Sequence, residues 1–263
     1  MLYPDAPFYM DKREWILHYA MNYLYPSFCN YKDPVQLLSV ITPTNKSIYL
    51  DNILENYANQ SYLNKELILV LHNNGLQYGE WAAACSRLKN IRIYQLDDDL
   101  SLGDCLNYAV EQANGDIVAK FDDDDYYGPG YLQEAVNCFQ YTEAAIVGKV
   151  SHFVYFENSM KLGLINKGQG FQYLDYLFGG THVVKREVFE KIKFRPISLG
   201  EDCDFNFDCR QNGYLLYACG PMNYVRVRRY DKIHHAWKLE DDDFEGGCSF
   251  IASTPDFRAY ANG

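Results

Sequence analysis

From residue 34 onward, short apolar runs alternate with segments whose apolar residues recur every three or four positions. Four of the runs are expected to be strands, at residues 37–42, 66–71, 91–96 and 116–121. The segments between them are expected to be helices, because residues three and four apart share one helical face. Apolar strands separated by amphipathic helices predict an α/β fold, with a mostly parallel sheet covered by helices on both faces.

Polar motifs follow three of these predicted strands. They are PTNK at residues 43–46, HNNG at residues 72–75 and four aspartates at residues 122–125. The carboxyl ends of parallel strands meet at one edge of a sheet, where such folds bind their ligands. The sequence therefore predicts that the three motifs converge on a single site.

The second half of the chain is less regular. Residues 144–156 are expected to form a long strand or a hairpin, and residues 161–172 a loop. Residues 177–192 are expected to form a strand followed by a short helix. Residues 201–213 are expected to form a helix with acidic residues in its first turn, where the helix dipole favours negative charge.

Both ends of the chain are expected to lie outside the main domain. Residues 1–33 are expected to form a helical extension, with Ile16 and Tyr19 on one apolar face. Such a face either packs on its own domain or docks onto a second copy or a preceding domain. Residues 238–263 are expected to form a C-terminal tail with a solvated acidic run at residues 240–243.

Composition narrows the class of protein. The 263 residues include 24 Lys and Arg against 35 Asp and Glu, a formal charge of −11, which argues against nucleic-acid binding. The eight cysteines have no metal-binding spacing, so free thiols and a cytoplasmic location are expected. No signal peptide or membrane-spanning run is found, so any membrane contact is expected to be peripheral.

The four aspartates carry the clearest chemical signal. Carboxylates crowded at a strand end repel one another unless they share a cation. Hard divalent cations take carboxylate oxygens, and Mg²⁺ leaves coordination positions open for substrate phosphates. Asp122 and Asp124 form a DxD pair that can hold one ion. The alternative is a solvated acidic turn, which is how most charge runs are found.

Four segments, in order, resemble the family 2 glycosyltransferases of the GT-A fold. Residues 39–75 and 101–132 are similar to the nucleotide-sugar half of that family, and residues 179–192 and 200–214 to its acceptor half. The resemblance covers residues 35–237 and implies a Rossmann-like GT-A domain. We place that domain at residues 34–237, with residues 34–130 as the nucleotide-binding half and residues 131–237 as the acceptor half.

The resemblance implies an inverting, metal-dependent hexosyltransferase. Its donor is expected to be a UDP-sugar, and its acceptor a hydroxyl of a carbohydrate or glycoconjugate, in polysaccharide, cell-surface or glycoconjugate synthesis. A sugar nucleotidyltransferase would need a Gly- and Arg-rich loop after the first strand, and TPTNKSIY contains neither residue. Two alternatives stay open: a non-catalytic module that binds nucleotide-sugar or carbohydrate, and a catalytic unit that requires a partner domain.

On the donor side, the resemblance assigns residues after each strand. Pro43 and Thr44 would line the nucleoside pocket, and Asn73 stands where the family usually has an Asp that reads the nucleobase. Arg228 or Arg229 would hold the diphosphate. The donor-binding residues implied in this way are Pro43, Thr44, Asn73, Asp122, Asp123, Arg228 and Arg229.

The metal and acceptor residues follow from the same resemblance. Asp124 is the expected direct ligand of Mn²⁺ or Mg²⁺, joined by His234 or His235. Asp202, in the motif GEDCDF, matches the catalytic base of the family. The residues assigned to substrate binding are Gly180, Thr181 and Glu201.

Overall fold

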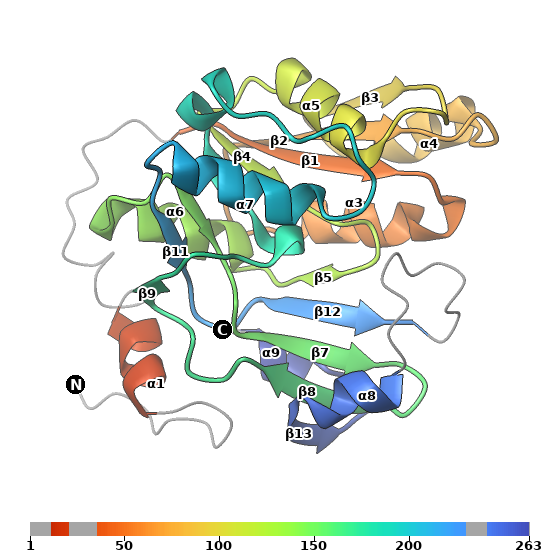
Figure 1. Cartoon of the computed structure of the whole chain (residues 1–263). Helices are drawn as coiled ribbons and strands as arrows, with labels where there is room; N and C mark the ends of the chain where they lie inside the picture. Colours follow the sequence, from red (N-terminus) through yellow and green to blue (C-terminus); the bar gives the residue numbers. More distant parts are fainter. Residues whose placement is uncertain (1–11, 21–35, 230–240, 263) are drawn as a thin grey trace.

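The computed structural model describes residues 12–20, 36–229 and 241–262, which build two β-sheets (Figure 1). The larger, eight-stranded sheet contains, in spatial order, β3 (Ile91–Gln95), β2 (Lys65–Leu71), β1 (Leu38–Thr44), β4 (Ile117–Lys120), β10 (Val183–Lys185), β6 (Ile146–Gly148), β11 (Leu216–Ala218) and β9 (Gln172–Tyr173). Strands β1 to β4 pair in parallel, whereas β10 runs antiparallel to both β4 and β6. The predicted α/β architecture is confirmed.

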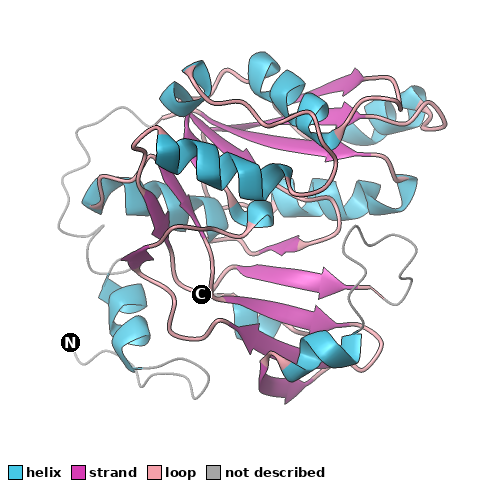
Figure 2. Cartoon of the chain, viewed as in Figure 1, coloured by secondary structure: helices cyan, strands magenta, loops and turns pink. Residues whose placement is uncertain are grey.

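Helices cover both faces of the large sheet (Figure 2). Strand β2 shows the reason, because Leu67 and Leu69 face one hydrophobic core and Ile68 and Val70 face another. A strand packed on both faces needs apolar side chains throughout, which explains its continuous apolar run. The first core includes α3 (Leu50–Ala58), α4 (Tyr78–Cys85) and α6 (Tyr131–Tyr141), and the second includes α5 (Leu102–Gln112) and α7 (Glu201–Gln211).

The smaller sheet, in the lower part of Figure 1, was not predicted. Its strands are, in order, β13 (Ser249–Ser253), β8 (Lys161–Ile165), β7 (His152–Phe156), β12 (Tyr224–Arg228) and β5 (Tyr126–Tyr127). Residues 144–156 are divided between β6 of the large sheet and β7 of the small one, and the expected loop at residues 161–172 contains β8. Three short 3-10 helices complete the central part: η2 (Ser47–Tyr49), η3 (Gly179–Thr181) and η4 (Arg186–Glu190).

The C-terminal residues 241–262 are part of this fold and differ from the tail that we expected. They form α8 (Asp241–Gly246), β13 and α9 (Arg258–Ala261). Strand β13 pairs antiparallel with β8 and forms an edge of the small sheet. Phe244 of α8 is buried in a small core with Val154 and Phe156 of β7.

The described part of the N-terminal extension is α1 (Lys12–Tyr19). Its most buried side chains are polar, Glu14 and His18, whereas Ile16 is half-buried. The amide nitrogen of Gly170 donates a hydrogen bond to Glu14 Oε1 at 3.1 Å. Leu17 and Trp15 pack against the hydrophobic cores of the two sheets, so the helix contacts its own domain through both polar and apolar side chains. Docking onto a second copy or a preceding domain stays a prediction.

Glu66 joins three segments at one end of the large sheet. Ser39 Oγ and the Asn114 amide nitrogen donate hydrogen bonds to Glu66 Oε1 at 2.6 and 2.7 Å, and Arg92 Nη2 lies 2.8 Å from Glu66 Oε2. Burial opposes ionisation of this carboxylate, but the hydrogen bonds from Ser39, Asn114 and Arg92 outweigh burial and lower the pKa of Glu66. Its contribution to stability is therefore present above its unfolded-state pKa and is lost as pH falls through the folded-state pKa.

We expect Glu66→Gln to lower the free energy of unfolding by about 2 kcal/mol near neutral pH, because charge-assisted hydrogen bonds are lost. The loss should shrink at acidic pH, as the pH falls through the lowered folded-state pKa of the wild-type carboxylate. Urea unfolding at both pH values measures the difference. Glu111→Gln is the control, since its ion pair with Lys193 is exposed on both sides. An equal loss for Glu66→Gln at both pH values would contradict this account.

Candidate active site

A cleft of about 470 Å³ opens where the carboxyl ends of β1 and β4 meet the start of α7 and strand β12. The predicted site residues that line it are Pro43, Thr44, Asp122, Asp123, Asp124, Gly180, Glu201, Asp202 and Arg228. The PTNK loop and the aspartates therefore converge, as their places after parallel strands indicated. From the HNNG motif, His72 lines the cleft, whereas Asn73 is not among the lining residues.

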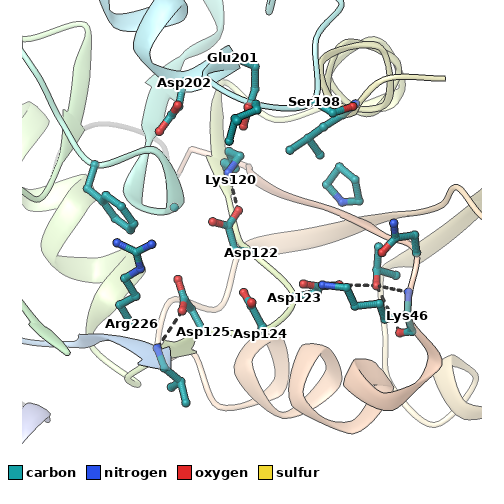
Figure 3. A pocket seen from close by; sticks show the side chains of 18 of the residues that line it. Lys46, Lys120, Asp122, Asp123, Asp124, Asp125, Ser198, Glu201, Asp202 and Arg226 are labelled. Carbon is teal, nitrogen blue, oxygen red and sulfur yellow. Dashed lines mark hydrogen bonds and ion pairs between the residues drawn. The ribbon is translucent and has the colours of Figure 1, made fainter. Parts of the chain in front are cut away.

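The first aspartates of the acidic run are held by side chains from two strands. Asp122 forms an ion pair with Lys120 of β4. Thr44, at the end of β1, donates a hydrogen bond from its hydroxyl to Asp123 Oδ2 at 2.6 Å. Asp124 is turned toward the same opening as Asp122 (Figure 3). The run therefore presents carboxylates to the cleft and is not a solvated turn.

Asp125 connects the acidic run to the rest of the molecule. Its carboxylate accepts hydrogen bonds from the Tyr224 hydroxyl and from the Val227 amide nitrogen, the latter at 3.0 Å. Its carbonyl oxygen accepts from the side-chain nitrogens of Asn52 and Asn56 at 2.9 and 2.8 Å. Asp125 thus links β12 of the small sheet to α3 and fixes the position of the run.

Crowding of negative charge alters the acidities in the run. Burial, followed by the neighbouring Asp124, raises the pKa of Asp123 to about 7. Burial, followed by Asp124 and Asp122, raises the pKa of Asp125 to about 8. The surrounding positive charge is therefore too small for all four carboxylates to be ionised easily, and a bound cation would favour their charged forms.

These residues fit a hard divalent cation. Carboxylate oxygens are preferred ligands of such ions, and one or two carboxylates are enough when substrate phosphates complete the coordination. Asp122 and Asp124 supply oxygens in the cleft. Within the described ranges no group of three or more His, Cys, Asp or Glu could hold a metal by itself. The other predicted ligands, His234 and His235, lie outside the described residues.

Two glycines of η3 make room for carboxylates from opposite sides of the cleft. A Cβ atom on Gly179 would lie 2.2 Å from Asp202 Oδ2, and one on Gly180 would lie 2.7 Å from Asp122 Oδ2. Both distances are shorter than the contacts that Cβ atoms make in proteins, so a side chain at either position would displace a carboxylate. This close approach explains the GG pair, and it shows that Gly180 borders the acidic run directly.

Asp202 stands in the first turn of α7, opposite the acidic run. Gly200 precedes this helix in the left-handed conformation with φ 83°, which glycine adopts readily. In Figure 3 the carboxylates of Asp202 and Asp122 lie around the same opening but come from different elements. The adjacent Glu201 is buried, and this burial, opposed by the charge of Lys120, raises the pKa of Glu201.

Lys120 and Arg226 line the cleft and were not singled out from the sequence. Burial opposes the charge of Lys120, but Asp122 and Glu201 outweigh it and raise the pKa of Lys120. The Arg226 guanidinium lies 4.8 Å from the centre of the Phe178 ring. A lysine inside an apolar strand, and an arginine alternating with valines, were the signals that could have identified them.

The two arginines expected to hold a diphosphate have protein partners. Arg228 is buried, with its Nη2 2.9 Å from Asp241 Oδ1. Arg229 donates from Nη2 to the Asp124 carbonyl oxygen at 3.0 Å, and its Nη1 lies 3.5 Å from Glu157. Their contact with the donor stays a prediction. Asp241, which was expected to be solvated, is paired, and its carboxylate compensates the charge of the buried Arg228 guanidinium.

Asn73 and Thr181 bond to the backbone around the cleft. Asn73 Nδ2 donates to the Asn45 carbonyl oxygen at 2.9 Å, which joins the HNNG turn to the PTNK loop. Thr181 is buried, and its hydroxyl donates to the Phe178 carbonyl oxygen at 2.6 Å. Both residues therefore shape the loops around the cleft, and a direct contact of either with substrate stays a prediction.

The family model described as Glycosyl transferase family 2 matches residues 39–193, which is more than half of the chain. The chain belongs to this family. A curated relative from Haemophilus influenzae, described as an uncharacterized glycosyltransferase, is 25% identical over 200 residues, covering 73% of this chain and 79% of the relative.

Solved structures confirm the GT-A fold of this glycosyltransferase. A fragment of S. aureus TarS in complex with UDP-GlcNAc has a TM-score of 0.61 at 19% identity, over 80% of this chain and 64% of that one. Mannosyltransferase PcManGT from Pyrobaculum calidifontis, in complex with GDP-Man and Mn²⁺, has a TM-score of 0.57 at 18% identity, over 84% of this chain and 68% of that one. This glycosyltransferase therefore spans less than two thirds of the TarS structure.

We expect Gly179→Ala to displace the carboxylate of Asp202, because the new Cβ atom would lie 2.2 Å from its Oδ2. A displacement of about 1 Å can reduce a catalytic rate about 100-fold. The measurement is release of nucleoside diphosphate from a nucleotide-sugar, together with the melting temperature. Gly79→Ala is the matched control, since a Cβ there meets nothing within 4 Å. Wild-type turnover in a folded Gly179→Ala variant would show that the close approach has no functional importance.

Proposed function

We propose that the protein is an inverting, metal-dependent glycosyltransferase that moves a hexosyl group from a UDP-sugar to a hydroxyl of a carbohydrate or glycoconjugate. One observation carries the proposal. The acidic run and Asp202 line the same cleft but are supplied by different elements, β4 and α7 (Figure 3). Carboxylates on separate elements can act separately, one group on the leaving nucleotide and the other on the acceptor.

Asp202 is the proposed general base. The acceptor hydroxyl would transfer its proton to the Asp202 carboxylate while its oxygen attacks the anomeric carbon of the donor. The electron pair of the breaking bond would remain with the diphosphate oxygen, and the nucleoside diphosphate would leave from the opposite face. A direct displacement of this kind inverts the anomeric configuration.

Stabilisation of the leaving group is assigned to the other side of the cleft. Lys46, Lys120 and Arg226 line it and can offset the negative charge of a diphosphate. A divalent cation, Mn²⁺ or Mg²⁺, held by Asp122 and Asp124 would supply further charge neutralisation for the departing diphosphate. Asp123, which is bonded to Thr44, would keep the donor loop and the metal-binding turn together.

A UDP-sugar is the proposed donor. TarS has been solved with UDP-GlcNAc and with UDP, and PcManGT with GDP-Man and Mn²⁺. The side-chain amide of Asn73 has an oxygen that can accept a hydrogen bond from the N3–H of uracil. Among the relatives both uracil and guanine occur, so the nucleobase is the first property to measure.

A cytoplasmic location is proposed on the basis of the cysteines. Cys85, Cys105, Cys138, Cys209 and Cys219 are buried with free thiols, as is usual in a reducing compartment. As a separate finding, none of the described helices has the length and apolar character needed to cross a membrane.

The proposal is tested by thermal unfolding with UDP, GDP, CDP and ADP, each with Mn²⁺ and with a chelator. A ligand at about 100 times its Kd stabilises the folded state by roughly 2.7 kcal/mol, which raises Tm by several degrees. We expect a Mn²⁺-dependent rise with UDP. A rise in Tm with another nucleotide would identify that nucleotide, and not UDP, as part of the donor. No rise with any of the four would favour a non-catalytic protein or one that requires a partner domain.

We expect Asp124→Ala to abolish the Mn²⁺-dependent part of this rise, because it removes a proposed metal ligand. The matched control is Asp98→Ala. Asp98 is exposed and belongs to the three aspartates at residues 97–99, which follow β3. The Mn²⁺-dependent rise in Tm of Asp98→Ala should equal that of the wild type. An unchanged rise in Asp124→Ala would remove Asp124 from the metal site.

We expect Asp202→Asn to keep the UDP-dependent rise in Tm and to lower sugar transfer by at least about 100-fold, the usual contribution of a general base. Asp204→Asn is the control, since Asp204 is in the same turn of α7 and pairs with Arg195 at 3.1 Å. Transfer is measured as release of UDP from the donor. Similar rates in Asp202→Asn and Asp204→Asn would contradict the assignment of the base.

A further inference from the structure

The solvent-facing side of α7 carries a stripe of residues that leads away from the cleft. Cys203, Phe207 and Arg210 are exposed, and their spacing of four and three places them on one helical face. Phe207 is 52% exposed, which is unusual for a ring of this size. At about 1.5 Å rise per residue the stripe is about 10 Å long, and it begins next to Asp202.

The segment between β9 and η3 runs alongside α7 (Figure 1). Its register on α7 is fixed at two points. Arg210 Nε lies 3.1 Å from Asp175 Oδ1. Leu177 and Asn206 exchange two hydrogen bonds, from the Leu177 amide to Asn206 Oδ1 at 3.2 Å and from Asn206 Nδ2 to the Leu177 carbonyl oxygen at 2.9 Å. Side chains between these points therefore have defined positions beside α7.

Tyr176 lies between those two contacts in the sequence. It is 39% exposed. Burial and then the charge of Asp202 raise the pKa of Tyr176, so its ring is within electrostatic reach of the proposed base. Cys203, where the stripe begins, directly follows Asp202, which lines the cleft, so the stripe starts at the point where an acceptor hydroxyl would react.

At its far end the stripe reaches a shallow pocket of about 250 Å³. Tyr173, Arg210 and Leu215 line this pocket, and Tyr173 and Leu215 are 48% and 46% exposed. The Tyr173 hydroxyl accepts a hydrogen bond from the Glu143 amide nitrogen at 3.0 Å, which restricts the orientation of the ring. We call the whole path, from Tyr176 through Phe207 to this pocket, the aromatic track.

We infer that the aromatic track binds the acceptor chain behind its reacting sugar, so that the acceptor is an oligosaccharide or polysaccharide and not a monosaccharide. The inference rests on the proposed function. Aromatic rings offer flat apolar faces to the C–H faces of sugars, and Asp175 and Arg210 offer an acceptor and donors to hydroxyl groups. A path that extends about 10 Å along α7 is longer than one sugar ring.

The composition of the track favours a glycan over a protein partner. A stable protein interface buries about 800 Å² per partner around an apolar centre. Here the Asp175–Arg210 ion pair stands among the rings, and its carboxylate is 81% exposed. An acceptor chain must lead from the track to Asp202, because its end sugar reacts there. A separate protein partner would not need the track to reach Asp202.

The test uses binding of cello-, chito- and malto-oligosaccharides of one to six units to the protein saturated with UDP and Mn²⁺, measured by titration calorimetry. We expect the affinity for at least one series to rise with length beyond one unit and then level off. Phe207→Ala should weaken binding of the longest oligomer roughly tenfold and leave the UDP-dependent rise in Tm unchanged. Phe250→Ala is the matched control, since Phe250 is 64% exposed on β13.

Three results would overturn the inference. They are affinities that do not rise with length in any series, equal oligomer binding by Phe207→Ala and the wild type, and a dimer that dissociates when Phe207 is changed. Failure of the proposed function has a different signature. In that case UDP with Mn²⁺ would not raise Tm in the wild type, whatever the oligosaccharides do.

Discussion

Four consecutive carboxylates at the end of β4 are the constraint to which the neighbouring structure conforms. They repel one another, and burial makes the repulsion stronger, so the turn holds its shape only because other groups bond to it. The contacts of Asp125 with β12 and α3, and of Asp123 with Thr44, draw both sheets and the first loop to this point. The fold therefore keeps ready an arrangement that a cation and a diphosphate would stabilise.

On the side of the cleft formed by η3, the position of the carboxylates depends on close packing against the backbone. The backbone of η3 passes so near to Asp122 and Asp202 that only Gly179 and Gly180 leave space for their carboxylates. Because η3 touches both, it sets the distance between the metal-binding side and the side of the proposed base. A reaction that needs a nucleophile and a leaving group in line depends on such spacing.

The cationic side chains that line the cleft differ in the protein groups that hold them. Lys120 is buried beside Asp122 and Glu201, and Arg226 is stacked on Phe178, so both are held in place before any ligand binds. Arg228, two residues along the same strand, is instead neutralised by Asp241 from α8. The two arginines have the same sequence pattern, and their different surroundings come from tertiary contacts.

The sequence alone determined the parallel part of the large sheet and the place of the site, because apolar periodicity reports burial and polar motifs after parallel strands must meet at one edge. It could not predict the small sheet, since apart from the β7–β8 hairpin its short strands pair across long separations in the chain. For the same reason it could not assign Arg226, the pairing of Arg228 with Asp241 or the exposed side of α7. Their roles depend on which distant side chain lies beside each of them, and only the tertiary structure decides that.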